Sequence, residues 1–479
     1  MASNDELVTE MVKVCPYCGH FNLGTEKLRC DRCWLLLRKV VAVPRSHAES
    51  REIGKKRRIL INRLIRPILA IAISIGFTTW GLLVFIDREP TPENAVTDIN
   101  VTVNSKTWAL GRGDPQNTAF TRAQARTPKE INWTYSNPMS LLASPSVVDG
   151  RVYLTTQDGL AVALDAETGK TLWEHSTGLP SSSTPAVTNG IVVIGLRPGE
   201  IVALDNETGS VLWHWRKRDG ENHIFTSPII VNGTVYVGSG RTLRAFDVYT
   251  GQQLWDFKTK EWILSPVAYK DDTIVIATRD SLIHIVDAKT GKMRFVFDSG
   301  RTRFGEGPLV HENIAYFTSY GGLVWAIDRL AITYPIERAV WYWKFQFFMW
   351  NMISAPPQQK GSIWGTRVGG DILSNPAFAH SKVYVANVQG KVFALDAGTG
   401  KVLWETDVGF HTSTAPTVAG TTVLIGTVDG LVFGLDTDTG EILWNFKVHG
   451  TVTDSPIVVD DTMYVIAADG KLYAVGGTQ

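Results

Sequence analysis

Ser144 to Gly178 reads SPSVVDGRVYLTTQDGLAVALDAETGKTLWEHSTG, and the same pattern recurs along the chain. Apolar and polar residues alternate in it between three turn sequences, Asp149-Gly150, Gln157-Asp158-Gly159 and Glu167-Thr168-Gly169. Alternation with a period of two is typical of strands, and short turns rich in Gly, Asn and Asp join antiparallel neighbours. The stretch therefore predicts one unit of four antiparallel strands.

The unit occurs eight times. Its opening strand carries a proline, at Pro145, Pro185, Pro228, Pro266, Pro308, Pro376, Pro416 and Pro456, and only the interval from Pro308 to Pro376 is much longer than the others. Its closing strand carries a tryptophan, at Trp133, Trp173, Trp213, Trp255, Trp404 and Trp444, with Phe295 in that place in the fourth unit. Four strands in a period of about 40 are typical of a β-propeller. We predict an all-β fold, an eight-bladed propeller of four-stranded antiparallel blades over residues 108–479.

The two ends of the repeat region complement each other. The last unit ends with Leu472-Tyr473-Ala474-Val475 and has no closing tryptophan strand. Ile131 to Tyr135 supplies such a strand near the start, with Trp133 one repeat period before Trp173. We predict that this N-terminal strand completes the eighth blade, so that no open sheet edge remains.

An uncharged stretch divides the chain into two oppositely charged parts. Residues 67–86, PILAIAISIGFTTWGLLVFI, have the length that a helix needs to cross a bilayer. Residues 1–66 hold 14 Lys and Arg against seven Asp and Glu, a net charge of +7, and the remainder holds 33 against 40, or −7. Basic residues concentrate in a linker over 41–66, before the span, and residues 87–107 form a tether after it. The positive-inside rule predicts a single-pass cell-membrane protein with a cytoplasmic N-terminus and an extracytoplasmic propeller.

All four cysteines precede the predicted span. Cys15-Pro-Tyr-Cys18 and Cys30-Asp-Arg-Cys33 have the spacing with which four thiolates surround one zinc ion. Residues 13–40 therefore resemble a short zinc ribbon, except that Trp34 stands where a glycine is usual after the second pair. The ribbon either docks a cytoplasmic partner or is a metal-stapled cap. Nucleic-acid binding is not expected, because the basic run beside the span fits lipid headgroups better.

Leu164 to Trp173, LDAETGKTLW, and its copy over Leu395 to Trp404 resemble the repeat of pyrroloquinoline-quinone-type propellers. The lead-in WALGRGDPQNT, from Trp108 to Thr118, is similar to the one before their first tryptophan strand. The resemblance covers about residues 108–478 and implies the propeller fold. That repeat is shared by quinoprotein alcohol dehydrogenases and by BamB-type lipoproteins, which are scaffolds in outer-membrane protein assembly. In every blade the tryptophan docks the neighbouring blade, which is a structural role.

The resemblance to quinoprotein dehydrogenases implies a cofactor held against a disulfide of adjacent cysteines, but this propeller contains no cysteine. Pyrroloquinoline quinone is therefore not expected. The aspartates of the repeats fit turn hydrogen bonds better than calcium or acid-base roles; they include Asp165, Asp205, Asp396 and Asp436. His223, His411 and His449 lie in loops between blades, at spacings that favour a polar channel lining over a metal site.

The long interval between Pro308 and Pro376 marks an aromatic-rich insertion at 341–370 in the fifth blade. Trp341, Trp343 and Phe345 are predicted to form that blade's outer strand. The apolar residues beyond them are the predicted partner-binding set, Phe347, Phe348, Met349, Trp350 and Met352. Exposed aromatic residues are typical of interaction sites. The alternative is that the insertion covers its own blade or the channel mouth.

These features predict a non-catalytic protein. We expect a membrane-anchored, extracytoplasmic scaffold that binds envelope or membrane proteins through its propeller, in envelope protein assembly. Two alternatives stay open: a quinone-dependent oxidoreductase, and a transmembrane ligand sensor that signals through its zinc ribbon. The expected non-protein partners are one zinc ion and the lipid bilayer.

Overall fold

The computed structural model divides the chain into two compact units, Met1–Thr97 and Asp98–Gln479. It describes residues 10–16, 20–32, 34, 36–48, 105–139, 141–216, 226–263, 266–299, 307–332, 337–354 and 359–478. The predicted span at 67–86 and most of its two flanking linkers lie outside these ranges. Within them, no helix has both the length and the apolar character needed to cross a membrane.

The first unit contains a small three-stranded sheet with the order β2-β1-β3. Its strands are β1 Met11–Val14, β2 Phe21–Leu23 and β3 Val43–Pro44. The side chains of Cys15, Cys30 and Leu37 form its buried cluster. Trp34 adopts a positive φ of 60°. This left-handed conformation is uncommon for a bulky residue, and it is one that glycine adopts readily.

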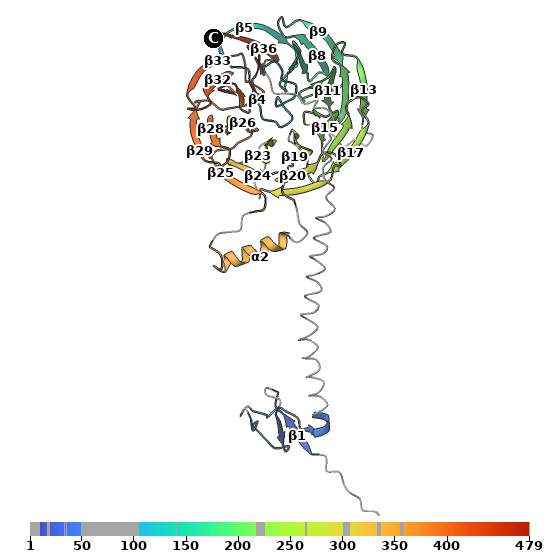
Figure 1. The fold of residues 1–479 in the computed structure, drawn as a ribbon, viewed down its shortest axis with the longest axis vertical. Coiled ribbons are helices and arrows are strands. Elements are labelled where there is room, and N and C mark those ends of the chain that lie inside the picture. The colour runs from blue at the N-terminus through green and yellow to red at the C-terminus, as the bar shows by residue number, and fades with distance from the viewer. Residues whose placement is uncertain are drawn as a thin grey trace, which may run out of the picture. The chain divides into compact units, whose positions relative to one another are not determined.

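The second unit is a ring of antiparallel sheets (Figure 1). Within the described residues, each of these sheets contains four strands of the repeat, and one of them gains a fifth strand, β4 Phe120–Thr121. In chain order the repeat strands are β6 Ser146–Val148, β7 Arg151–Thr155, β8 Leu160–Asp165 and β9 Thr171–Ser176; β10 Ala186–Thr188, β11 Ile191–Leu196, β12 Glu200–Asp205 and β13 Val211–Arg216; β14 Ile229–Val231, β15 Thr234–Ser239, β16 Thr242–Asp247 and β17 Gln253–Lys258; β18 Ala268–Lys270, β19 Thr273–Ala277, β20 Leu282–Asp287 and β21 Met293–Asp298; β22 Leu309–His311, β23 Ile314–Ser319, β24 Leu323–Asp328 and β25 Ser362–Arg367; β26 Ala377–Ala379, β27 Lys382–Ala386, β28 Lys391–Asp396 and β29 Val402–Asp407; β30 Thr417–Ala419, β31 Thr422–Gly426, β32 Leu431–Asp436 and β33 Ile442–Lys447; β34 Ile457–Val459, β35 Thr462–Ala467, β36 Lys471–Thr478 and β5 Thr127–Ser136.

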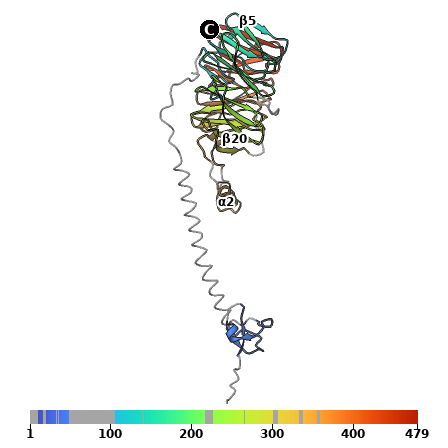
Figure 2. The same cartoon turned by 90° about the vertical axis from the view of Figure 1, so that its right-hand side faces the viewer.

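Burial follows the position of a strand within its sheet. Strands β7 and β8 are buried along most of their length, because both of their faces contact neighbouring sheets. The outer strand β9 instead alternates, with Trp173 buried between exposed residues. The core is therefore a series of apolar layers between sheets, and Figure 2 shows the ring from a second direction. This is the propeller architecture that the repeat predicts.

The N-terminal strand closes the ring, as predicted. Strand β5 pairs antiparallel with β36, and Trp133 lies opposite Ala474. Two register shifts in this pair bend the ladder near its end. The last sheet thus takes three strands from the C-terminal end of the chain and one from the N-terminal part.

The lead-in segment, residues 105–121, contacts the first strands of nearly all sheets in turn. Its carbonyl groups accept backbone hydrogen bonds of 2.6 to 3.0 Å from the N–H groups of Val147, Val187, Tyr269, Val310, Phe378, Val418 and Asp460. These donors belong to or adjoin seven different first strands. At the remaining sheet, a Cβ added to Gly111 would lie 3.2 Å from Ser227 Cβ. The segment ends in β4, which pairs parallel with β30. It therefore joins the inner strands of the ring.

The insertion forms a helix, which corrects one sequence prediction. Trp341, Trp343 and Phe345 lie in α2 Glu337–Met349 and do not form the outer strand. That strand is β25, which pairs with β24 through Trp364 opposite Ala326. The insertion therefore occupies the β24–β25 connection, and residues 362–367 of the predicted 341–370 belong to the sheet. Because Trp364 stands one repeat period before Trp404, the repeat already contained this signal.

Candidate functional site

Tryptophans of the outer strands join each sheet to the next. Trp173 Nε1 donates a hydrogen bond of 2.9 Å to Asn206 O of the following sheet. Equivalent bonds of 2.7 to 3.1 Å come from Trp133, Trp213, Trp255 and Trp404, and also from Trp364, which the sequence analysis missed. Trp444 is buried in the same position of its own sheet. An indole in this place combines apolar burial with one directed hydrogen bond.

The aspartates of the repeats hold the turns that receive these indoles. Asp165 accepts hydrogen bonds from the hydroxyl and the backbone N–H of Thr168, at 2.6 and 2.8 Å. The Thr168 hydroxyl contributes most to lowering the pKa of Asp165. Asp205, Asp396 and Asp436 have the same arrangement, also with a lowered pKa. These carboxylates are occupied by their own turns, as the sequence analysis expected.

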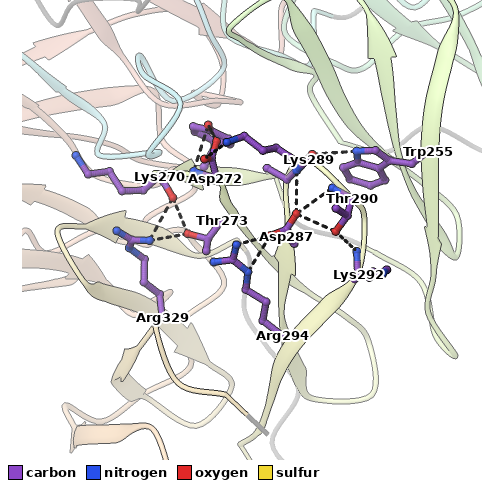
Figure 3. Close-up of polar contacts among 12 residues, drawn as sticks. Trp255, Lys270, Asp272, Thr273, Asp287, Lys289, Thr290, Lys292, Arg294 and Arg329 are labelled. Atoms are coloured by element: carbon purple, nitrogen blue, oxygen red, sulfur yellow. Dashed lines mark hydrogen bonds and ion pairs between the residues drawn. The ribbon is translucent and has the colours of Figure 1, made fainter. Parts of the chain in front are cut away.

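The junction between the sheet β18–β21 and the sheet β22–β25 differs from those joined by a tryptophan hydrogen bond. Phe295, whose side chain has no N–H group to donate, stands there in place of tryptophan. Arg329, which is 2% exposed, reaches back across this junction. Its guanidinium donates to Thr273 Oγ1 at 2.7 Å, to Lys270 O at 3.2 Å and to Asp271 Oδ2 at 2.7 Å. Figure 3 shows Arg329 directed at Lys270 and Thr273, beside the regular turn of Asp287. Arg329 thus supplies the polar cross-link that Phe295 lacks.

The insertion that contains α2 begins shortly after Arg329 in the sequence. The predicted partner-binding residues Phe347, Met349, Trp350 and Met352 are 37%, 59%, 57% and 66% exposed, and Phe348 is half-buried. Val340, Trp343, Phe347 and Trp350 follow one another at spacings of three and four residues, so they share one face of the helix. We call these four residues the aromatic stripe. Within the described residues, the ring contacts of α2 join its own aromatics to one another and to Trp350.

The ribbon cysteines are only partly described. Cys15 and Cys30 are each 1% exposed and share one buried cluster. Each begins a tight turn, since Cys15 N–H donates to His20 O at 3.0 Å and Trp34 N–H donates to Cys30 O at 2.9 Å. Cys18 and Cys33 lie outside the described residues. The arrangement of the first two fits a thiolate site at the base of two turns.

The lead-in segment contacts the inner strands of the ring through buried polar side chains as well as through its backbone. Arg112 donates to Pro376 O, Pro416 O and Ser455 Oγ at 3.0 to 3.2 Å, and it is 6% exposed. Burial is the main cause that raises the pKa of Asp114 on the same segment. His411 and His449 are exposed, and His223 lies outside the described residues. In the described part of the chain, no group of three His, Cys, Asp or Glu residues is arranged to hold a metal ion.

A comparison with known protein families identifies the family to which the propeller belongs. The family model of the outer membrane protein assembly factor BamB matches residues 118–243, 239–331 and 350–478, which together cover most of the chain. The chain belongs to the BamB family. Its repeats are thus the pyrroloquinoline-quinone-type repeats that the sequence resembles.

Solved structures share the fold of this BamB-family chain. BamB from Moraxella catarrhalis is 19% identical, with a TM-score of 0.58 over 73% of this chain and 98% of that one. A europium-containing methanol dehydrogenase is 15% identical, with a TM-score of 0.62 over 78% of this chain and 98% of that one. At such identities, the likeness shows the fold alone.

A curated relative matches over a shorter range. The quinoprotein alcohol dehydrogenase PedE of Pseudomonas putida is 29% identical over an alignment of length 138 that covers 25% of this chain. The match spans 22% of that dehydrogenase, about a fifth of its length. BamB and quinone-dependent dehydrogenases therefore both share the fold of this chain.

Proposed function

We propose that this chain is a membrane-anchored interaction scaffold, with an eight-bladed propeller held outside the cytoplasm to bind an envelope protein. Its anchor would be the uncharged span at 67–86, and α2 would be a contact element. The family match to an assembly factor supports a role in envelope protein assembly. The absence of cysteine from the propeller sequence supports a non-catalytic role.

The observation that carries this proposal is the exposure of α2. Trp343 and Trp350 are 54% and 57% exposed, whereas the tryptophans of the outer strands mostly lie buried against the next sheet. Tryptophan is enriched among the residues that dominate binding energy at interfaces. A helix that interrupts a repeat and exposes such residues has the composition of a contact surface.

The test is a crosslinking pull-down of the full chain from intact membranes. A variant with Trp343→Ser, Phe347→Ser and Trp350→Ser is compared with a control carrying Leu172→Ser, Leu212→Ser and Leu254→Ser, which are 47%, 47% and 52% exposed on outer strands. We expect the native chain and the control to capture the same envelope protein, and the α2 variant to capture at least about tenfold less. A native chain that captures no specific protein contradicts the scaffold. Equal capture by the α2 variant contradicts the role of α2.

We also propose that the ribbon binds one zinc ion through Cys15, Cys18, Cys30 and Cys33, because the burial of two of them in one cluster fits thiolate ligands. Zinc bound there would contribute most of the folding free energy of so small a unit. A Cys15→Ser variant should lose zinc, measured by atomic absorption of the purified full chain. If a cytoplasmic partner is lost with the zinc and the propeller also binds a small ligand, the sensor alternative is favoured over the scaffold.

The second candidate is a quinone-dependent oxidoreductase, favoured by the local identity to a quinoprotein dehydrogenase. The residues present do not fit the cofactor site that the family resemblance implies, since the propeller has no adjacent cysteines. The acidic and histidine side chains of the described ranges are not grouped for calcium. Dye reduction after incubation of the full chain with pyrroloquinoline quinone and calcium would favour the enzyme and contradict the scaffold.

A further inference from the structure

The proposed function makes α2 a contact element, and the composition of α2 narrows the kind of surface that it contacts. Aromatic residues make up most of the sequence from Trp341 to Trp350. The apolar residues are not confined to the aromatic stripe, because Trp341, Tyr342 and Met349 are 41%, 54% and 59% exposed as well. A helix that is apolar on nearly all sides requires an environment that surrounds it.

We infer that α2 inserts into the headgroup region of the lipid bilayer, parallel to its surface. This rests on the proposed function, because a lipid contact of α2 would hold the propeller at the membrane surface where it captures its envelope protein. An α-helix with side chains is about 10 to 12 Å thick, and interfacial helices sink about 5 to 10 Å into the headgroup and acyl boundary. Immersion of this kind covers most of the perimeter of α2, including the aromatic stripe and the exposed side chains of Trp341 and Tyr342.

The length and the residue types of α2 fit the interface and not the bilayer core. Its 13 residues extend about 20 Å, which is less than the hydrocarbon thickness of about 30 Å. Tryptophan and tyrosine concentrate at membrane interfaces because an apolar ring there carries a polar N–H or O–H group. Lys344 is exposed on the helix. Its long aliphatic stem allows the ammonium group to reach lipid phosphates.

The position of the predicted anchor in the chain makes the bilayer the nearest extended apolar surface. Residues 87–104 separate the uncharged span from the start of the described propeller unit at residue 105. Even a fully extended segment of that length reaches only about 60 Å. A tether of this reach raises the effective concentration of lipid at α2 far above that of a diffusing protein. Weak interfacial affinity is therefore sufficient for α2 to bind.

Photo-crosslinking in native membranes tests this inference on the full chain. The photoreactive residue p-benzoylphenylalanine is placed at Phe347 or Trp350 in separate variants. The matched control carries it at Tyr249, an aromatic residue that is 56% exposed on a turn of the propeller. Irradiated protein is purified, and its adducts are identified by mass spectrometry. We expect phospholipid adducts at 347 and 350 at about ten times the level found at 249, since only α2 would lie among lipids.

Three outcomes overturn the inference. Adducts to another protein at 347 and 350 would make α2 a docking helix for a protein groove, and the scaffold proposal would stand without its lipid contact. Adducts to this chain's own blade would show that α2 covers the propeller. Lipid adducts no more frequent than at Tyr249 would show that α2 does not lie in the bilayer. Lipid adducts at α2 in a chain that captures no envelope protein would support the inference and contradict the scaffold.

Discussion

The sheets β22–β25 and β26–β29 are neighbours built from the same repeat, yet they join their last two strands very differently. In the second sheet, Asp396 to Gly400 make a short turn, and Asp396 N–H donates to Lys401 O at 2.8 Å. In the first sheet, the whole insertion lies between Asp328 and Gly361, but Asp328 N–H still donates to Gly361 O at 2.7 Å. Both sheets also have their register shift at the same place, after Ala326 and after Ala394. The sheet thus keeps its ladder whatever the connection contains.

The physical reason is that closing a longer loop costs little. The free energy of loop closure rises by about 0.6 kcal/mol for each doubling of length, so a roughly eightfold longer connection costs about 2 kcal/mol. A repeat protein can therefore acquire a helix such as α2 at one turn without rebuilding the blade. The junction with the preceding sheet also differs from the others, since Phe295 and Arg329 stand there in place of the usual tryptophan contact.

The largest expected effect is at Arg329. Replacing Arg329 by Ala removes a buried guanidinium and the hydrogen bonds that it donates to Thr273 Oγ1, Lys270 O and Glu312 O. We expect a loss of about 3 kcal/mol of unfolding free energy, measured from the denaturant midpoint. Asp271→Ala is the control, and it should cost less than about 1 kcal/mol because this carboxylate is 66% exposed. Equal losses would mean that the ion pair, and not the cross-junction hydrogen bonds, stabilises the junction.

The next largest loss of stability is expected at Gly400, in the turn that joins β28 to β29. A Cβ at Gly400 would lie 2.5 Å from the ring of Trp364, and the φ of Gly400 is +70°. Gly409 has a similar φ of +75° with no atom within 4 Å of such a Cβ. Gly400→Ala should therefore cost about 2 to 3 kcal/mol, and Gly409→Ala about 1 kcal/mol, since only the first adds a clash to the strain. Similar melting temperatures for the two variants would contradict docking of Trp364 on Gly400.

A smaller change in unfolding free energy is expected when the β24–β25 connection is replaced by the short turn that joins β28 to β29. Residues 329–360 are replaced in the full chain by the turn of the neighbouring sheet, residues 397–400, with Gly361→Lys. Unfolding free energy should change by no more than about 2 kcal/mol, because the shorter loop offsets the loss of Arg329. Circular dichroism of the strands should be unchanged. An unfolded or aggregated product would show that the insertion is required for the blade.

The smallest effect is at the docking indole itself. Trp364→Phe keeps most of the buried ring but removes the Nε1 hydrogen bond of 2.9 Å to Ala397 O. We expect a loss of about 1 kcal/mol, as for other single buried hydrogen bonds. Unchanged stability of Trp364→Phe would contradict a contribution of this hydrogen bond to the junction.

The repeat allowed much of this structure to be predicted from sequence. Regular spacing located the strands, and the unpaired ends of the repeat identified β5 as the closing strand. The outer strand of the fifth unit was misplaced because Trp341, Trp343 and Phe345 alternate like a strand. Their neighbours also follow a helical spacing, and local pattern alone does not decide between the two. The role of Arg329 depends on a contact across a junction between sheets, which no local pattern encodes.

The pairing of β5 with β36 also sets the order in which the molecule can fold. Trp133 and Ala474 are brought together across almost the whole propeller sequence. Contacts at such separation form late, because the intervening chain must be ordered first. During synthesis, the residues that close the ring are made early and wait unpaired until the last sheet is complete. Any truncation before β36 therefore leaves an open strand edge at both ends of the ring, and protection of β5 until closure becomes a condition for reaching the native state without aggregation.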